Sequence, residues 1–90
     1  MLLDVVDVVA RPPYFLDLEF ENGERRRFDM APLMDEPPFN RLKGSPLFFR
    51  ARVQCGTVAW PGRIDVAPET LYDGSEPLLV GADVPDRPSS

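Results

Sequence analysis

The 90-residue sequence contains no histidine and a single cysteine, Cys55. With so few candidate ligands the usual zinc sites cannot be built. One cysteine forms no internal disulfide, which agrees with a reducing compartment. No apolar run approaches the roughly 20 residues that a membrane span requires, and no basic stretch precedes the apolar N-terminus. We therefore expect a cytoplasmic protein with no metal, no cofactor and no membrane contact.

Acidic residues are missing from one part of the chain, residues 37–64. This block carries a net charge of +5, whereas residues 1–36 and residues 65–90 each carry −5, so the average of −5 hides a strong pattern. The negative total argues against non-specific attraction to DNA or to anionic lipid. The bases of the central block are Arg41, Lys43, Arg50, Arg52 and Arg63.

Alternation of apolar and acidic residues predicts a strand over residues 14–21. We expect this strand to enter a hairpin through the three-residue loop Glu21-Asn22-Gly23, with Gly23 at the position that requires a positive φ. This register also places opposite charges across from one another on the outer face. It pairs Leu16 with Phe28, Glu19 with Arg25, and Asp17 with Arg27.

A six-residue pattern occurs twice, as Arg-Phe-Asp-Met-Ala-Pro at residues 27–32 and as Arg-Ile-Asp-Val-Ala-Pro at residues 63–68. Both copies follow a predicted hairpin, and in both an aspartate stands three residues before a proline. This arrangement predicts that a strand ends and a helix begins there, with Asp29 and Asp65 capping the helices. The alternative is that the two aspartates meet as a pair of carboxylates.

The remaining patterns complete a fold prediction of the α+β class. Valines over residues 2–10 predict a strand with an open edge, which invites homodimerisation. Residues 51–54 and 57–60 predict a second hairpin around Cys55-Gly56. We expect one domain over residues 1–75, with one antiparallel sheet of about five strands and two or three short helices, after residues 35 and 65, on one face. Residues 76–90 are expected to form an extension, with an edge strand or docking segment at residues 78–80 and mobility over residues 85–90.

The ordered motifs along residues 18–72 resemble a bacterial family of unknown function, DUF2442. The most specific stretch runs from Trp60-Pro61 through Asp65-Val-Ala-Pro to Leu71-Tyr72. The resemblance implies a small α+β domain. It also implies that some members continue into a helix-turn-helix domain and that some sit in pairs similar to toxin–antitoxin modules. Only residues 73–90 follow Tyr72, fewer than a helix-turn-helix needs, so we expect no direct reading of DNA.

Candidate partner-binding residues come from the central basic block and its aromatic side chains. A recognition surface would use the bases of that block and Trp60 as an aromatic anchor, binding an acidic protein partner. Three alternatives stay open. In the first, the acidic blocks neutralise the bases of the central block within the molecule. In the second, the central block binds nucleic acid. In the third, Trp60 fills the core and contacts no partner.

No pattern in the sequence indicates catalysis. Carboxylates such as Asp4, Asp7, Asp35 and Glu36 have spacings common on solvated faces, and Cys55 lacks a histidine to activate it. We therefore assign no catalytic residue. The leading hypothesis is a non-catalytic protein-interaction module that serves as the binding component of a toxin–antitoxin-like pair, ahead of an accessory nucleic-acid binder and a small enzyme.

Overall fold

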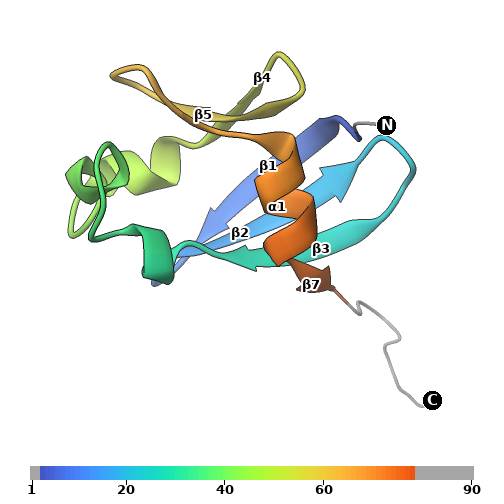
Figure 1. The fold of residues 1–90 in the computed structure, drawn as a ribbon, viewed down its shortest axis with the longest axis horizontal. Helices are drawn as coiled ribbons and strands as arrows, with labels where there is room; N and C mark the ends of the chain where they lie inside the picture. The colour runs from blue at the N-terminus through green and yellow to red at the C-terminus, as the bar shows by residue number, and fades with distance from the viewer. Residues whose placement is uncertain (1–2, 79–90) are drawn as a thin grey trace.

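The computed structural model describes residues 3–78 and shows two antiparallel sheets rather than the single sheet expected (Figure 1). The first sheet has the strand order β1-β2-β3-β7, and the second has the order β4-β5-β6. The strands of the first are β1 (Val5–Arg11), β2 (Phe15–Phe20), β3 (Arg25–Asp29) and β7 (Glu76–Pro77). Those of the second are β4 (Arg52–Gln54), β5 (Thr57–Trp60) and β6 (Ile64–Val66).

The first hairpin has the predicted register. Leu16 pairs with Phe28, Asp17 with Arg27, and Glu19 with Arg25. Gly23 has a φ of 88°, and its N–H donates to the Phe20 carbonyl at 2.8 Å. Asn22 fixes the loop as well, because its side-chain oxygen accepts from the Glu24 N–H at 3.0 Å. The three-residue loop is therefore confirmed, and with it the separation of apolar and charged faces.

The second hairpin also lies where it was predicted. Strands β4 and β5 are joined by Cys55 and Gly56, whose φ values of 52° and 78° are those of the tight turn that suits a two-residue hairpin. β5 returns to β6 through Pro61, Gly62 and Arg63. Only one backbone hydrogen bond links this sheet to β1, from the Val5 N–H to the Gly56 carbonyl at 2.8 Å. This single link explains why one continuous sheet does not form.

Three short 3-10 helices connect the two sheets: η1 (Ala31–Leu33), η2 (Phe39–Arg41) and η3 (Pro46–Arg50). The turns stay short because prolines interrupt the segment. Ser45 caps η3, since its hydroxyl accepts from the Leu47 N–H at 3.1 Å and Pro46 follows in the first helical position. The helix expected after residue 35 is therefore only η2. Within residues 3–78, no helix is long and apolar enough to cross a membrane.

Both copies of the repeated pattern mark a junction from strand to helix, as predicted. Pro32 lies in η1, and Pro68 begins helix α1 (Pro68–Gly74). The prediction that an aspartate caps the helix has a different outcome at each copy. The Asp29 carboxylate accepts from the Ala31 N–H at 2.9 Å, although the residue that formally precedes η1 is Met30.

The prediction that Asp65 caps a helix is wrong. Asp65 lies exposed in the middle of β6, two residues before Ala67, which precedes α1 and gives it no side-chain cap. Because β6 continues to Val66, the Asp65 side chain points off the outer face of the sheet instead of toward the helix start.

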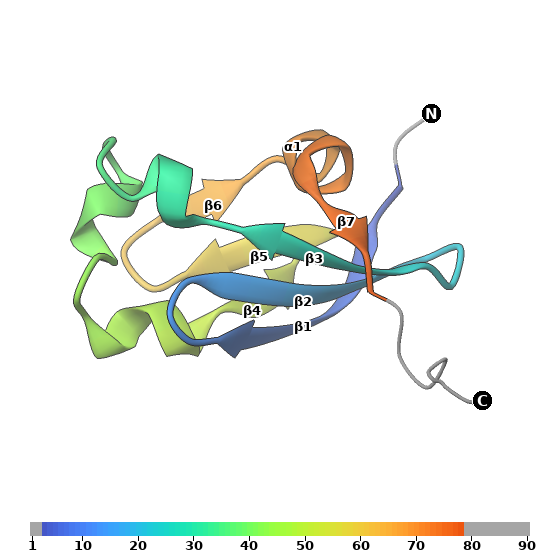
Figure 2. The same cartoon turned by 90° about the horizontal axis from the view of Figure 1, so that it is seen from below.

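The second sheet, and not a layer of helices, covers the inner face of the first (Figure 2). Helix α1 lies beside β3, and the three 3-10 turns gather at the end of the molecule where β2 begins (Figures 1 and 2). The side chains between the sheets form one core, in which Phe20, Phe48, Leu16 and Leu71 have no exposed surface.

Part of the expected C-terminal extension joins the first sheet. β7 pairs with β3 through Arg26 opposite Pro77 and Arg27 opposite Glu76, and the Leu78 N–H donates to the Arg25 carbonyl at 2.8 Å. The edge strand therefore begins at Glu76, before the expected residue 78, and residues 79–80 lie outside the described residues. The mobility expected over residues 85–90 concerns positions outside the described residues.

Candidate functional site

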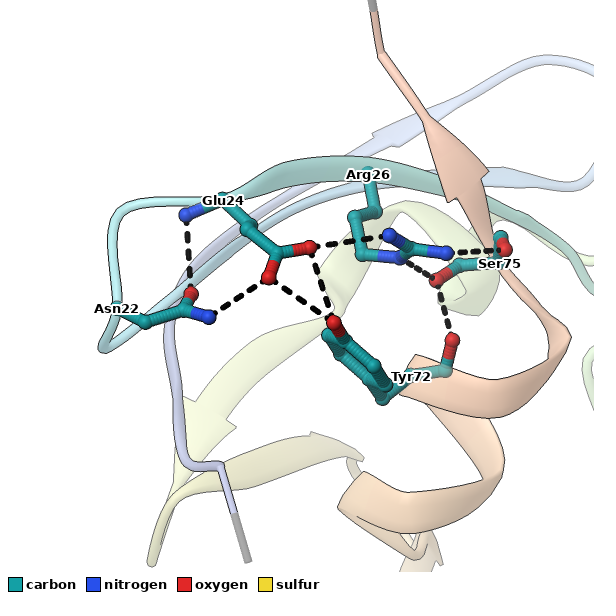
Figure 3. Close-up of polar contacts among 5 residues, drawn as sticks. All are labelled: Asn22, Glu24, Arg26, Tyr72 and Ser75. Carbon is teal, nitrogen blue, oxygen red and sulfur yellow. Dashed lines mark hydrogen bonds and ion pairs between the residues drawn. The ribbon is translucent and has the colours of Figure 1, made fainter.

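Two clusters of polar residues stand out in the structure, and they lie on different elements. The first joins the β2–β3 hairpin to α1, and we call it the Arg26 network: Asn22, Glu24, Arg26, Tyr72 and Ser75 (Figure 3). The second surrounds the loop from Pro61 to Arg63, and we call it the arginine face: Arg41, Arg52 and Arg63.

Arg26 is the centre of the first cluster, with a side chain only 15% exposed. Its guanidinium donates to the Ser75 hydroxyl at 2.6 Å, to the Ser75 carbonyl at 2.8 Å and to the Glu24 carboxylate at 3.0 Å (Figure 3). The guanidinium carbon also lies 4.6 Å from the centroid of the Tyr72 ring. Arg26 faces inward because it shares a face of β3 with Phe28, so its charge requires these partners.

Tyr72 and Glu24 complete the network. The Tyr72 hydroxyl donates to both Glu24 carboxylate oxygens, at 3.1 and 2.9 Å, and its ring packs edge-on against Phe20 at 5.2 Å. The hydroxyl holds the pKa of Glu24 below its usual range, with help from Asn22 and Arg26. The same hydrogen bond raises the pKa of Tyr72. Because every charged group here has a partner, the network ties α1 to the hairpin and offers no free group for chemistry.

The arginine face lies on the outward side of the second sheet. Arg52 and Arg63 line one hollow of about 440 Å³ together with Gln54, Ala59 and Asp65. The pairing of Arg52 with Ala59, and of Ala59 with Asp65, puts these positions side by side across three strands. Arg41 reaches the same loop from η2, donating to the Gly62 carbonyl at 3.1 Å.

No residue of the arginine face forms an ion pair within residues 3–78. Arg52 donates only to the side-chain oxygen of Gln54, at 3.3 Å, and Arg41 only to a backbone carbonyl. Arg50 is also exposed, at the end of η3, and lies two residues before Arg52. The first sheet differs, because there Asp17 holds both Arg27 and Arg11 and has a lowered pKa, chiefly through its hydrogen bond with Arg27.

Arg63 has an unusual backbone conformation, with a φ of 63° next to Gly62 at 92°. The left-handed region disfavours residues with a Cβ by roughly 1–2 kcal/mol. Glycine or asparagine would suit the position better. A long cationic side chain in an exposed, strained position points to a role for the side chain itself.

Of the predicted partner-binding residues, Trp60 is buried, whereas Lys43 forms an ion pair at the surface. Trp60 is 1% exposed, and its indole N–H donates to the Phe48 carbonyl at 2.9 Å while its ring stacks on Phe48. The prediction that Trp60 anchors a partner is therefore wrong, because its side chain points between the sheets. Lys43 is exposed but pairs with Asp35, which raises the pKa of Lys43.

Sequence reasoning did not find the Arg26 network, since Arg26 and its partner Ser75 are 49 residues apart in the chain. One signal was present: the confirmed register places Arg26 opposite Leu18, on the apolar face. Cys55 lies exposed at the tip of a turn, and in the described part of the chain no three histidine, cysteine, aspartate or glutamate residues are grouped to hold a metal.

Comparison with known proteins gives one match. A family model described as "Protein of unknown function (DUF2442)" matches residues 5–77, which include both hairpins, α1 and β7. This match confirms the resemblance seen in the motifs between residues 18 and 72. No curated protein and no solved structure matches the chain.

Proposed function

The chain belongs to the DUF2442 family, and we propose that it acts as a non-catalytic protein-interaction module whose arginine face binds an acidic surface of a partner. One observation carries the proposal. Arg52 and Arg63 line one hollow, and although Asp65 lines it too, neither arginine forms an ion pair among residues 3–78.

Guanidinium groups in this arrangement are suited to binding carboxylates. Each offers a planar set of donors that engages a carboxylate through two parallel hydrogen bonds. Arg41 is held in place by its bond to the Gly62 carbonyl, so little conformational freedom is lost when it binds. The hollow between Arg52 and Arg63 gives an aspartate or glutamate of the partner a defined position. Arg50, which is exposed nearby in the chain, extends the basic region.

We propose that the partner is the second component of a pair resembling a toxin–antitoxin module, with this chain as the binding component. Support for such a pair comes from the family resemblance and from the chemistry of the arginine face. The Arg26 network supports a non-catalytic role, because its charged groups are bound to one another across the junction of hairpin and helix.

The placement of aromatic side chains favours a protein partner over nucleic acid. Binding of single strands relies on exposed rings that stack on bases. In the central basic block Trp60 and Phe48 are buried, whereas Phe49 is 51% exposed. Duplex binding would rely on many phosphate contacts, which a net charge of −5 opposes.

A pull-down from the native host tests the proposal. The tagged full chain is compared with the double variant Arg52→Glu/Arg63→Glu and with Arg50→Glu/Arg52→Glu. We expect a co-purifying protein that both variants retain at least tenfold less well, since two charge reversals at a contact cost several kcal/mol. The control is Arg25→Glu, which reverses one charge on the first sheet, where Arg25 pairs with Glu19, and should keep the partner.

Two results would overturn the proposal. One is equal retention by the wild type and both arginine variants. The other is binding to a labelled oligonucleotide that falls steeply with salt and disappears in Arg52→Glu/Arg63→Glu, which would assign the arginine face to nucleic acid.

A further inference from the structure

The exposed large apolar residues within residues 3–78 are gathered around one strand. Val6 and Val9, which are 52% and 43% exposed, lie on β1. Phe49 and Val53 lie on η3 and β4, two of the elements that contact β1. Scattered apolar residues need no explanation, but a set that follows one sheet edge marks an interaction surface.

Strand β1 is the outer strand of its sheet, so one side of its backbone has no neighbouring strand in the ladder. The Glu21 N–H donates to the Asp4 carbonyl, whereas the Phe20 N–H donates to the Glu24 carbonyl on the other side of β2. Odd-numbered residues of β2 therefore bond toward β1, where they face Asp7 and Val9. Because successive residues of a strand alternate in direction, the backbone N–H and C=O groups of Val8 and Ala10 point away from β2, toward the open side of β1.

These outward groups have no backbone partner among the described residues. Among residues 3–78, the one backbone hydrogen bond from the outer side of β1 runs from the Val5 N–H to the Gly56 carbonyl. A β-bulge, which disrupts pairing at a sheet edge, lies between Val5 and Asp7. The stretch from Asp7 to Arg11 is regular, and no described strand of the ladder pairs with its outer side.

The sequence of this stretch is complementary to itself. In an antiparallel pair centred on Val9, Val8 of one copy faces Ala10 of the other, and these are the two residues whose backbone groups point outward. The same register places Asp7 opposite Arg11 of the second copy, twice by symmetry. Asp7 has no ion-pair partner within residues 3–78, whereas Arg11 shares Asp17 with Arg27.

We propose that two copies of the chain associate through β1, antiparallel and with Val9 facing Val9, so that the two four-stranded sheets become one continuous sheet. Paired side chains at positions without ladder hydrogen bonds lie closest together, which suits both the Val9 contact and the ion pairs of Asp7 with Arg11. The two-fold axis is perpendicular to the sheet. Phe49 and Val53 of both copies therefore lie on the same side of the joined sheet, next to the seam.

Sedimentation of the full chain tests this proposal. We expect a dimer of twice 10.1 kDa that dissociates on dilution. Asp7→Arg and Arg11→Asp each place like charges opposite one another and should raise the dissociation constant about tenfold. The combined variant Asp7→Arg/Arg11→Asp restores opposite charges and should recover most of the affinity, an outcome specific to this register.

A second variant removes backbone pairing without touching a charge. Ala10→Pro loses the N–H that points away from the sheet, so the chain should still fold, as judged by circular dichroism, but remain a monomer. A wild type that stays monomeric at high concentration overturns the proposal, as does a dimer that Ala10→Pro leaves intact or a double charge variant no tighter than the single ones. Arg52→Glu/Arg63→Glu should dimerise normally, because neither residue lies on β1. Loss of dimerisation and loss of the proposed partner binding can therefore be told apart.

Discussion

Arginine side chains have different surroundings in the two sheets. On the first sheet the arginines are bound: Arg27 to Asp17, Arg25 to Glu19, and Arg26 to Glu24 and Ser75. On the second sheet Arg52 and Arg63 line a hollow without an ion pair in the described part of the chain. The difference follows from strand pairing, because acidic β2 lies directly beside basic β3, whereas β5, which carries no charged residue, separates Arg52 of β4 from Asp65 of β6. The arginine charge on the first sheet is neutralised within the fold, whereas the charges of Arg52 and Arg63 are not paired among residues 3–78, which is the basis of the proposed partner binding.

The largest effect on stability is expected for Trp60→Ala. This substitution changes the core beneath the second sheet and leaves the exposed arginines of that sheet in the sequence. Trp60 is buried between Phe48 and Phe39, so the substitution leaves a large cavity and an unpaired Phe48 carbonyl. We expect a loss of about 3–5 kcal/mol in the free energy of unfolding, measured with urea. A loss below about 1 kcal/mol would mean that Trp60 is not part of the core.

Arg26→Ala and Arg52→Ala compare the two kinds of arginine directly. Arg26→Ala removes several charge-assisted hydrogen bonds and leaves the carbonyl of buried Ser75 without the Arg26 donor, although the Ser75 hydroxyl still donates to the Tyr72 carbonyl, so we expect a loss of about 2–3 kcal/mol. Arg52→Ala should change the free energy of unfolding by no more than about 0.5 kcal/mol. Equal losses in the two variants would contradict the division between bound and available arginines.

The pH dependence of stability should reflect the bound groups of the first sheet. The pKa values of Glu24 and Asp17 are lowered from 4.5 and 3.8, so the stability that they add is present above those values and is lost as the pH falls through the lowered ones. The pKa of Tyr72 is raised from 10.0, so its contribution is present below pH 10.0 and is lost as the pH rises through the raised value.

Thermal unfolding from acidic to alkaline pH measures these losses. Glu24→Gln should weaken the acidic decline, and Tyr72→Phe should weaken the alkaline one. Unchanged curves in both variants would show that the hydrogen bond between Tyr72 and Glu24 does not contribute to stability in solution.

The smallest effect is expected for Arg63→Gly, and it has the opposite sign. Glycine adopts a positive φ without steric cost, which outweighs its greater freedom in the unfolded chain, so the variant should be more stable by about 0.5 kcal/mol. Partner retention in the pull-down should nevertheless fall. A variant that is less stable, or that retains the partner fully, would remove the argument that the strain at Arg63 serves its side chain.

The sequence was most informative where neighbouring strands are joined by a short loop. The register of β2 and β3 and the turn at Cys55-Gly56 follow from local patterns, and so does the presence of a helix after β6, although it begins at Pro68 and not directly after Asp65. The split into two sheets could not be predicted, because it depends on how β4 packs beside β1, and the two strands are far apart in the chain.

The candidate site was predicted only in part, for the same reason. The basic block indicated Arg41, Arg52 and Arg63, but not that they meet at one loop. Trp60 was named on its chemistry, and its burial decides against it, whereas Lys43 is exposed and pairs with Asp35. Which way Trp60 faces is set by its pairing with Ile64 on the inner side of the sheet, a contact that the motif itself does not specify.

The most direct test measures how fast the arginine side-chain Nε–H protons exchange with water, by nuclear magnetic resonance on the full chain. It tests whether arginines are bound on the first sheet and unpaired on the second. We expect slow exchange and separate signals for Arg26 and Arg27, whose Nε–H groups donate to Ser75 and Asp17. Arg50, Arg52 and Arg63 should exchange rapidly and share averaged signals. Slow exchange at Arg52 and Arg63 in the isolated chain would show that their charges are already satisfied within the molecule, and would contradict the account.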